Sequence, residues 1–266
     1  MKVGFLITAR LKSKRLPFKI IKDLNGKTVL ERVIDRAKNV KDISEVILCT
    51  STNPQDKPLI DIAKNNSIYY FAGDEEDVLK RLFDASKLFS LDYFVSITAD
   101  NPLMDIYYSN LLINDIKTGK YDFIKLEGLP LGSAAYGMRV KALETVCEIK
   151  KIKDTEIWGY FIRPEIFEIK TINVTGKLKR PELRFTVDYE EDYELIRNIY
   201  NNVHSKNVLN LYDIIDYLDE NPEIAQINQN CAQMDLDNET KKEIEREYQN
   251  NLESIKNIKK EIYKES

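Results

Sequence analysis

The sequence lacks the features of exported, membrane-spanning and disulfide-bonded proteins. No apolar run approaches the ~18 residues that a helix needs to cross a bilayer, which excludes a helical membrane protein. The apolar stretch that ends at Ile7 is too short for a signal peptide, so we expect a buried first strand and a cytoplasmic protein. The cysteines Cys49, Cys147 and Cys231 are odd in number and far apart, which argues against a zinc site or disulfides and indicates small core residues.

Histidine is almost absent and no sign of charge dominates. The one histidine, His204, lies in a polar stretch where we expect a surface residue, so no nucleophile paired with a histidine is predicted. Forty basic against 44 acidic residues give a net charge of −4, which argues against a general nucleic-acid or membrane surface. An anionic ligand must therefore meet a local basic cluster.

Short apolar, β-branched runs alternate with helical periodicity through the first two-thirds of the 266 residues. This alternation is typical of an α/β fold with a mostly parallel sheet covered on both faces by helices. The predicted strands are Val3–Thr8, Val46–Ser51, Ile68–Phe71, Tyr93–Thr98 and Phe123–Leu126. The predicted helices between them are Thr28–Asn39, Asp56–Asn65, Glu76–Phe89 and Tyr107–Thr118.

The pattern is less regular after residue 127. Phe167–Asn173 and Leu183–Val187 are predicted as strands that complete a mixed edge, and Glu190–Tyr200 as a helix. From about residue 210 the composition becomes polar, and isoleucines, leucine and tyrosine recur at helical spacing over 244–262. We therefore divide the chain into a domain of residues 1–209 and a helical extension of residues 210–266, which either packs on the domain or binds a second subunit.

A cluster of positive charge follows the first predicted strand. Five basic residues lie close together with no acidic residue among them, namely Arg10, Lys12, Lys14, Arg15 and Lys19. Ligands of open α/β sheets bind beyond the carboxyl ends of the strands, so this loop is a candidate polyanion site. The alternative is a solvated basic loop.

Two carboxylates also follow predicted strands. Asp100 leaves the strand Tyr93–Thr98 just before Pro102, and Asp188 follows Leu183–Val187. Mg²⁺ prefers one or two carboxylates together with phosphate oxygens and water, so both are candidate metal ligands. The alternative is that they cap the segments that follow. A metal and fixed cations without a protein nucleophile are typical of nucleotidyl or phosphoryl transfer.

Residues 9–19, ARLKSKRLPFK, resemble the opening motif A-R-x-x-S-x-R-x-P-x-K of the cytidylyltransferases that activate acidic sugars. Further stretches at 25–30, 72–81, 97–103 and 185–192 match the family in order and spacing. The similarity covers roughly residues 1–220, and its nearest branch is the one named after spore-coat polysaccharide biosynthesis. It implies a Rossmann-like nucleotidyltransferase sheet, mostly parallel and mixed at one edge, and commonly a homodimer.

The resemblance implies roles for the basic loop. Arg10 and Lys19 would contact the phosphates of CTP, while Ser13 and Arg15 would shape the same loop. Arg10, Lys19 and Asp100 would be the catalytic residues. The reaction implied is attack of an acceptor oxygen on the α-phosphorus, with release of pyrophosphate.

The remaining roles that it implies concern the metal and the base. Asp100 and Asp188 would hold Mg²⁺, and Gly73, Asp77 and Arg81 would lie near the base or ribose. The acceptor would be a 2-keto-3-deoxy sugar acid for a surface glycan. The alternatives are a phosphorylated acceptor that gives a CDP-linked product, a glycosyltransferase of related fold, or a non-catalytic scaffold.

The chain departs from the family pattern at several positions. Lys12 and Phe18 replace common glycines, Tyr136 replaces a glutamate of close relatives, and residues 154–160 replace a stretch that often contains histidine. Tyr136 and Trp158 therefore either pack in the core or line an acceptor pocket. The one Asp-x-Asp sequence, residues 235–237, precedes the predicted tail helix, where we expect it to cap the helix.

Overall fold

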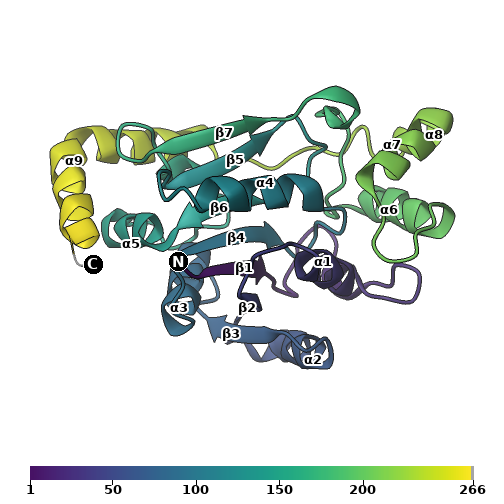
Figure 1. The fold of residues 1–266 in the computed structure, drawn as a ribbon, viewed down its shortest axis with the longest axis horizontal. Coiled ribbons are helices and arrows are strands. Elements are labelled where there is room, and N and C mark those ends of the chain that lie inside the picture. Colours follow the sequence, from purple (N-terminus) through teal and green to yellow (C-terminus); the bar gives the residue numbers. More distant parts are fainter. Residues whose placement is uncertain (265–266) are drawn as a thin grey trace.

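Seven strands form one sheet in the computed structural model, which describes residues 1–264. The strands are β1 Val3–Thr8, β2 Glu45–Ser51, β3 Tyr69–Gly73, β4 Tyr93–Thr98, β5 Phe123–Glu127, β6 Tyr136–Arg139 and β7 Ile169–Asn173. Their order across the sheet is β3-β2-β1-β4-β6-β5-β7 (Figure 1). Only β6 runs antiparallel to its neighbours β4 and β5, so the mostly parallel sheet with a mixed edge is confirmed.

Helices cover both faces of this sheet. They are α1 Val29–Lys38, α2 Lys57–Asn65, α3 Val78–Leu88, α4 Ile106–Ile116, α5 Val140–Ile149, α6 Glu190–Asn202, α7 Leu211–Glu220, α8 Pro222–Ala225 and α9 Asn238–Lys264. Four single 3₁₀ turns are η1 Lys19–Ile21, η2 Pro54–Asp56, η3 Gly159–Phe161 and η4 Gly176–Leu178. α1, α2, α4, α6 and α7 contribute to one hydrophobic cluster, and α3, α5 and α9 contribute to the other.

The central strand shows why the sequence folds in this way. Phe5 and Ile7 of β1 face the first cluster, whereas Leu6 faces the second, and all three are fully buried. Successive side chains of a strand point to opposite faces, so a strand covered by helices on both sides must be apolar throughout. The continuous apolar run near the N-terminus therefore fixes β1 in the middle of the sheet.

The strand order changes direction between β1 and β4. From β1 the chain continues to β2 and β3 on one side and then crosses to β4 on the other. Such a switch opens a crevice beyond the carboxyl ends of the two strands. Thr8 and Thr98 pair at these ends, so the basic loop after β1 and Asp100 after β4 leave the sheet side by side.

One predicted strand is wrong. Leu183–Val187 forms only an isolated bridge, between Arg184 and Leu131, and its backbone otherwise bonds to loops. The N–H of Val187, for example, donates to the carbonyl of Asp100 at 2.8 Å. All five residues are buried, but their backbone bonds to Leu131 and Asp100, which lie in loops and not in a strand. β6, α5 and α7 were not predicted from the sequence.

The C-terminal segments pack on the sheet domain. α7 contributes Ile214 and Ile215 to the first cluster, and α9 contributes Tyr248 and Ile255 to the second. Near its end, α9 is held by Lys259, whose Nζ lies 2.6 Å from a carboxylate oxygen of buried Asp122. Packing on its own domain is thus the role observed for α9, whereas the division at residue 209 stays a prediction.

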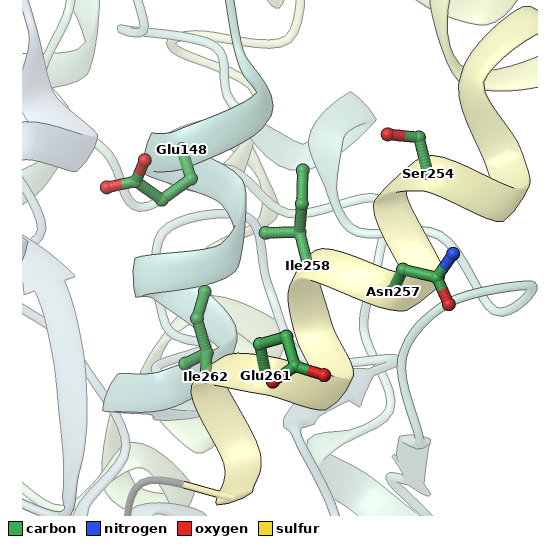
Figure 2. Close-up of a pocket in the computed structure, with 6 residues that line it drawn as sticks. All are labelled: Glu148, Ser254, Asn257, Ile258, Glu261 and Ile262. Atoms are coloured by element: carbon green, nitrogen blue, oxygen red, sulfur yellow. The ribbon is translucent and has the colours of Figure 1, made fainter.

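A shallow groove lies between α5 and α9, away from the carboxyl edge of the sheet. Figure 2 shows its lining residues, which are Glu148, Ser254, Asn257, Ile258, Glu261 and Ile262. The adjacent end of α9 bonds to Asp122, which comes just before β5 and therefore marks the opposite, amino edge of the sheet. No helix within residues 1–264 is both long enough and apolar enough to cross a membrane.

Candidate active site

Two acids far apart in sequence meet one lysine beyond the ends of β1 and β4. The Nζ of Lys19 lies 2.5 Å from Oδ2 of Asp100 and 2.7 Å from Oδ1 of Asp188. The three side chains are only 12%, 18% and 10% exposed, respectively. Arg15 adds a second cation, with its Nη2 at 2.9 Å from the same Asp188 oxygen. The expected convergence of the basic loop and both acids is therefore present.

The charges of this cluster stabilise one another. Burial alone would lower the pKa of Lys19, but the carboxylates of Asp100 and Asp188 outweigh it and raise that pKa above its ordinary value. Burial alone would likewise raise the pKa of Asp100, but the Lys19 ammonium and the hydroxyl of Thr98 hold it below its ordinary value. Lysine and acid are thus both charged at neutral pH.

The capping alternative is wrong for both acids. The N-cap of α4 is Asp105, whose carboxylate accepts the N–H of Tyr108 at 2.7 Å. At the start of α6 the N–H groups of Asp188 and Tyr189 donate to Asp192, at 2.9 and 3.0 Å. The carboxylates of Asp100 and Asp188 are therefore directed to the lysine and not to a helix end.

This pair of acids matches the ligand set that Mg²⁺ uses with nucleotides. Within the described residues, no three His, Cys, Asp or Glu side chains are grouped closely enough to enclose a metal ion. Mg²⁺ does not need such a cage, because substrate phosphates and water complete its coordination. Asp100 and Asp188 already share one cation, the Lys19 ammonium, so both can face a common cation.

The basic loop contacts the loop between β3 and α3, where the nucleotide base is expected to bind. Arg10 donates from Nη1 to the carbonyl oxygen of Glu75 at 2.6 Å, and its Nη2 lies 3.4 Å from Glu156. Lys12 pairs with the Glu75 carboxylate at 3.5 Å. The hydroxyl of Ser13 accepts the N–H of Leu16 at 3.4 Å, which is a turn contact within the loop.

Phe18 explains why relatives have glycine in this loop. Its backbone is left-handed, with φ of 57° and ψ of 21°, and its ring is 47% exposed. A side chain in that conformation costs about 1–2 kcal/mol, which glycine avoids. The loop therefore keeps the backbone shape that glycine favours, and Lys19 follows directly in the turn η1.

The three residues expected near the base surround the start of α3, outside the acid pair. Asp77 caps α3 by accepting the N–H of Lys80 at 3.0 Å, and it also pairs with the buried ammonium of Lys150. Arg81 donates from Nη1 to the carbonyl oxygens of Asp74 and Glu75, at 2.5 and 3.2 Å. These contacts shape the loop that begins after Gly73.

Gly73 itself is held in a crowded place. A Cβ there would lie 2.6 Å from the ring of Phe71 and 3.2 Å from Cγ of Arg81. This crowding accounts for glycine at the end of β3. A nucleotide contact by Gly73, Asp77 or Arg81 stays a prediction.

Tyr136 and residues 154–160, where the chain departs from the family pattern, differ in their surroundings. The rings of Tyr136 and Trp158 lie 4.7 Å apart and pack on the second hydrophobic cluster, and burial raises the pKa of Tyr136. These contacts agree with the packing alternative for both residues. Glu156, in contrast, is exposed and reaches Arg10 of the basic loop.

The Asp-x-Asp sequence, the histidine and the cysteines lie outside the acid pair. Asp237 accepts the N–H groups of Glu239 and Thr240, both at 2.9 Å, so the Asp-x-Asp sequence caps α9 as expected. His204 is exposed, as expected. Cys49 is buried, whereas Cys147 and Cys231 are only partly buried.

The residues that hold Asp188 from the side opposite Lys19 were not predicted from the sequence. Arg184 donates to Asp188 at 2.8 Å, and it also pairs with Asp192 and Gln233. The available signal was the spacing of Arg184, Asp188 and Asp192, which follow one another at intervals of four residues. A strand over residues 183–187, as predicted, would not by itself place these three side chains together.

Comparisons with known proteins agree with this geometry. The family model described as cytidylyltransferase matches residues 5–252. A spore coat polysaccharide biosynthesis protein of Bacillus subtilis is 25% identical over 83% of this chain and 95% of its own length. A 3-deoxy-manno-octulosonate cytidylyltransferase of Christiangramia forsetii is 30% identical over 38% of this chain and 40% of its own. A solved cytidylyltransferase structure from Leptospira borgpetersenii has a TM-score of 0.78 and 27% identity, covering 88% of this chain and all of that one.

Proposed function

Because the chain belongs to the cytidylyltransferase family, we propose that it transfers CMP from CTP to a 2-keto-3-deoxy sugar acid and releases pyrophosphate. The observation that carries this proposal is the single ammonium of Lys19 shared by Asp100 and Asp188, beside a cationic loop at the switch point of the sheet. The acceptor class is supported by the partial similarity to the 3-deoxy-manno-octulosonate enzyme. A role in surface polysaccharide synthesis is supported by the spore coat relative.

The charges of the site suggest how it accepts the nucleotide. The Lys19 ammonium lies between Asp100 and Asp188. We infer that this ammonium can turn to the phosphates of CTP and that Asp100 and Asp188 would hold Mg²⁺. The ion would supply positive charge that neutralises the phosphate oxygens as pyrophosphate departs.

The residues of the chain orient the reaction. Arg15 and Lys19 reach the acid pair, while Arg10 of the same loop bonds to the carbonyl oxygen of Glu75, so these cations can hold a triphosphate that extends along the loop. A hydroxyl oxygen of the acceptor forms the new bond to the α-phosphorus, and the bond to pyrophosphate breaks. Fixed cations stabilise the charge that accumulates on the phosphoryl oxygens.

We also propose that the protein forms a homodimer and acts in the cytoplasm, where CTP is present. A phosphorylated acceptor remains the chemical alternative to test. The glycosyltransferase alternative has no support from residues 235–237, because Asp237 caps a helix and the side chain of Asp235 pairs with Lys241 and Tyr160.

The test is a substrate panel. The protein is incubated with CTP or UTP, with or without EDTA, and with 3-deoxy-manno-octulosonate or a sugar phosphate as acceptor. We expect pyrophosphate release and a CMP-linked product only with CTP, the sugar acid and free Mg²⁺. A CDP-linked product would identify a phosphorylated acceptor, and no pyrophosphate with any combination would contradict the proposed activity.

A further inference from the structure

The Asp188 carboxylate is held from two opposite sides. Its Oδ1 receives Lys19 and Arg15 from the basic loop, at 2.7 and 2.9 Å. Its Oδ2 receives Nη2 of Arg184 at 2.8 Å. If the loop cations turn to a nucleotide, the contact from Arg184 is the one that still fixes the orientation of this carboxylate.

Arg184 is itself held on all three of its guanidinium nitrogens. Nε and Nη2 donate to the two oxygens of Asp192, at 2.9 and 3.3 Å, and Nη1 donates to Oε1 of Gln233 at 2.8 Å. Arg184 is 7% exposed and Asp192 is fully buried. Asp192 also accepts the backbone N–H of Asp188, so one rigid unit holds both the backbone and the side chain of that acid.

Two residues of the C-terminal extension contact Arg184 and Asp192. Asn228, which is 3% exposed, donates from Nδ2 to the carbonyl oxygen of Arg184 at 2.9 Å and to Oδ1 of Asp192 at 2.7 Å. Gln233 contacts the remaining nitrogen of Arg184. Both residues lie between α8 and α9, so a segment outside the expected catalytic domain reaches to within two side chains of Asp188.

Buried ion pairs often stabilise a fold weakly, so burial alone does not assign a role here. The distinguishing feature is that the network ends on a carboxylate whose other oxygen faces the Lys19 and Arg15 cations. Residues that orient a metal-binding carboxylate typically change metal affinity or activity about 10–100-fold when they are removed.

We propose that Arg184 is a positioning residue for Asp188. Asn228 and Gln233 of the C-terminal extension fix Arg184 in the orientation that this role needs. This inference rests on the proposed function, because it takes Asp188 as an acid of the cytidylyl-transfer site. It adds that the site requires the C-terminal extension to keep Asp188 in its orientation.

The test separates this role from the proposed reaction by measuring metal binding directly. Mn²⁺ alone is titrated into the full-length protein and followed by water-proton relaxation, next to the thermal midpoint and to kcat and KM for CTP. The variants are Arg184→Met, Gln233→Ala and Gln233→Glu, in which Glu keeps an acceptor oxygen. Gln229→Ala is the control, because this exposed glutamine lies in the same segment and its side chain has no contact with the network in the described residues.

We expect Arg184→Met to weaken Mn²⁺ binding and to lower kcat about 10–100-fold, with a smaller change in KM for CTP. Gln233→Ala should lower Mn²⁺ affinity about fivefold, because one hydrogen bond to the charged Arg184 disappears. Gln233→Glu should restore the wild-type Mn²⁺ affinity. Gln229→Ala should match the wild type.

Mn²⁺ affinity within twofold of the wild type in a folded Arg184→Met variant would overturn the proposal. If that variant does not fold, equal Mn²⁺ affinity of Gln233→Ala, Gln233→Glu and the wild type would overturn it instead. Failure of the wild type to use CTP would contradict the proposed function, while the Mn²⁺ titrations would still decide the positioning role.

Discussion

Replacing Lys19 with methionine removes the ammonium that Asp100 and Asp188 share but keeps the apolar stem. Removing one partner of a buried ion pair costs roughly 3–5 kcal/mol when the other charge stays buried. Arg15 and Arg184 still contact Asp188, whereas the side-chain hydrogen bond left to Asp100 within residues 1–264 comes from Thr98. We therefore expect the lower end of that range, about 3 kcal/mol of lost stability at pH 7.

The loss depends on pH with a defined sign. The pKa of Asp100 is lowered in the folded protein, so its contribution is complete above the unfolded value of about 3.9 and disappears as the pH falls through the folded value. The pKa of Lys19 is raised, so its contribution is complete below about 10.4 and disappears as the pH rises through the folded value. Wild-type stability should therefore receive a constant contribution from this pair between about pH 4 and pH 10.

The variant should behave differently as acid is added. Without Lys19, burial and the nearby Asp188 favour the protonated form of Asp100, so the stability gap between variant and wild type should narrow between pH 7 and pH 4. Mg²⁺ should also narrow the gap, because it can occupy the position that the ammonium leaves. The exposed lysine of the same loop provides the control, Lys14→Met.

The measurement is urea unfolding of the wild type and both variants at pH 7 and pH 4.5, with and without Mg²⁺. We expect Lys14→Met to match the wild type within about 0.5 kcal/mol under all conditions. Equal stability of Lys19→Met and wild type at pH 7, or a gap that neither acid nor Mg²⁺ changes, would refute the assignment of Lys19 as the shared cation.

Two further predictions concern other parts of the chain. Phe18→Gly should raise the free energy of unfolding by about 0.5–1 kcal/mol. Glycine relieves the left-handed backbone at φ 57°, and this gain exceeds the cost of the freedom that glycine adds to the unfolded chain. A loss of stability in urea unfolding would contradict this prediction. Burial raises the pKa of the Cys49 thiol to about 12, so a thiol reagent at pH 8 should modify Cys49 only after unfolding. Rapid labelling of Cys49 in the native protein, located by mass spectrometry, would contradict its burial.

The sequence predicted the elements whose physics is local. β1 and β4 are mostly apolar runs, and their predicted bounds agree with the structure. The start of α1 follows from the capping box of Thr28 and Glu31, whose side chains each accept the other's N–H group. The basic loop and Asp100 were found for the same reason, because each directly follows such a strand.

The elements that the sequence did not predict depend on distant partners. β6 has only four residues and is a strand because it lies between β4 and β5 in the finished sheet. Residues 183–187 look like a strand but have no free strand edge beside them. The Lys19 contacts likewise depend on β1 and β4 being neighbours, which the composition of neither segment reveals.

The most direct test of the site is the rate of pyrophosphate release from CTP and 3-deoxy-manno-octulosonate by Asp100→Asn, compared with Asp61→Asn, which removes the same charge from an exposed position of α2. We predict that Asp61→Asn retains the wild-type rate and that Asp100→Asn, while still folded, loses at least about 100-fold in kcat. A folded Asp100→Asn enzyme with the wild-type rate would contradict the assignment of this acid, and with it the site built around Lys19.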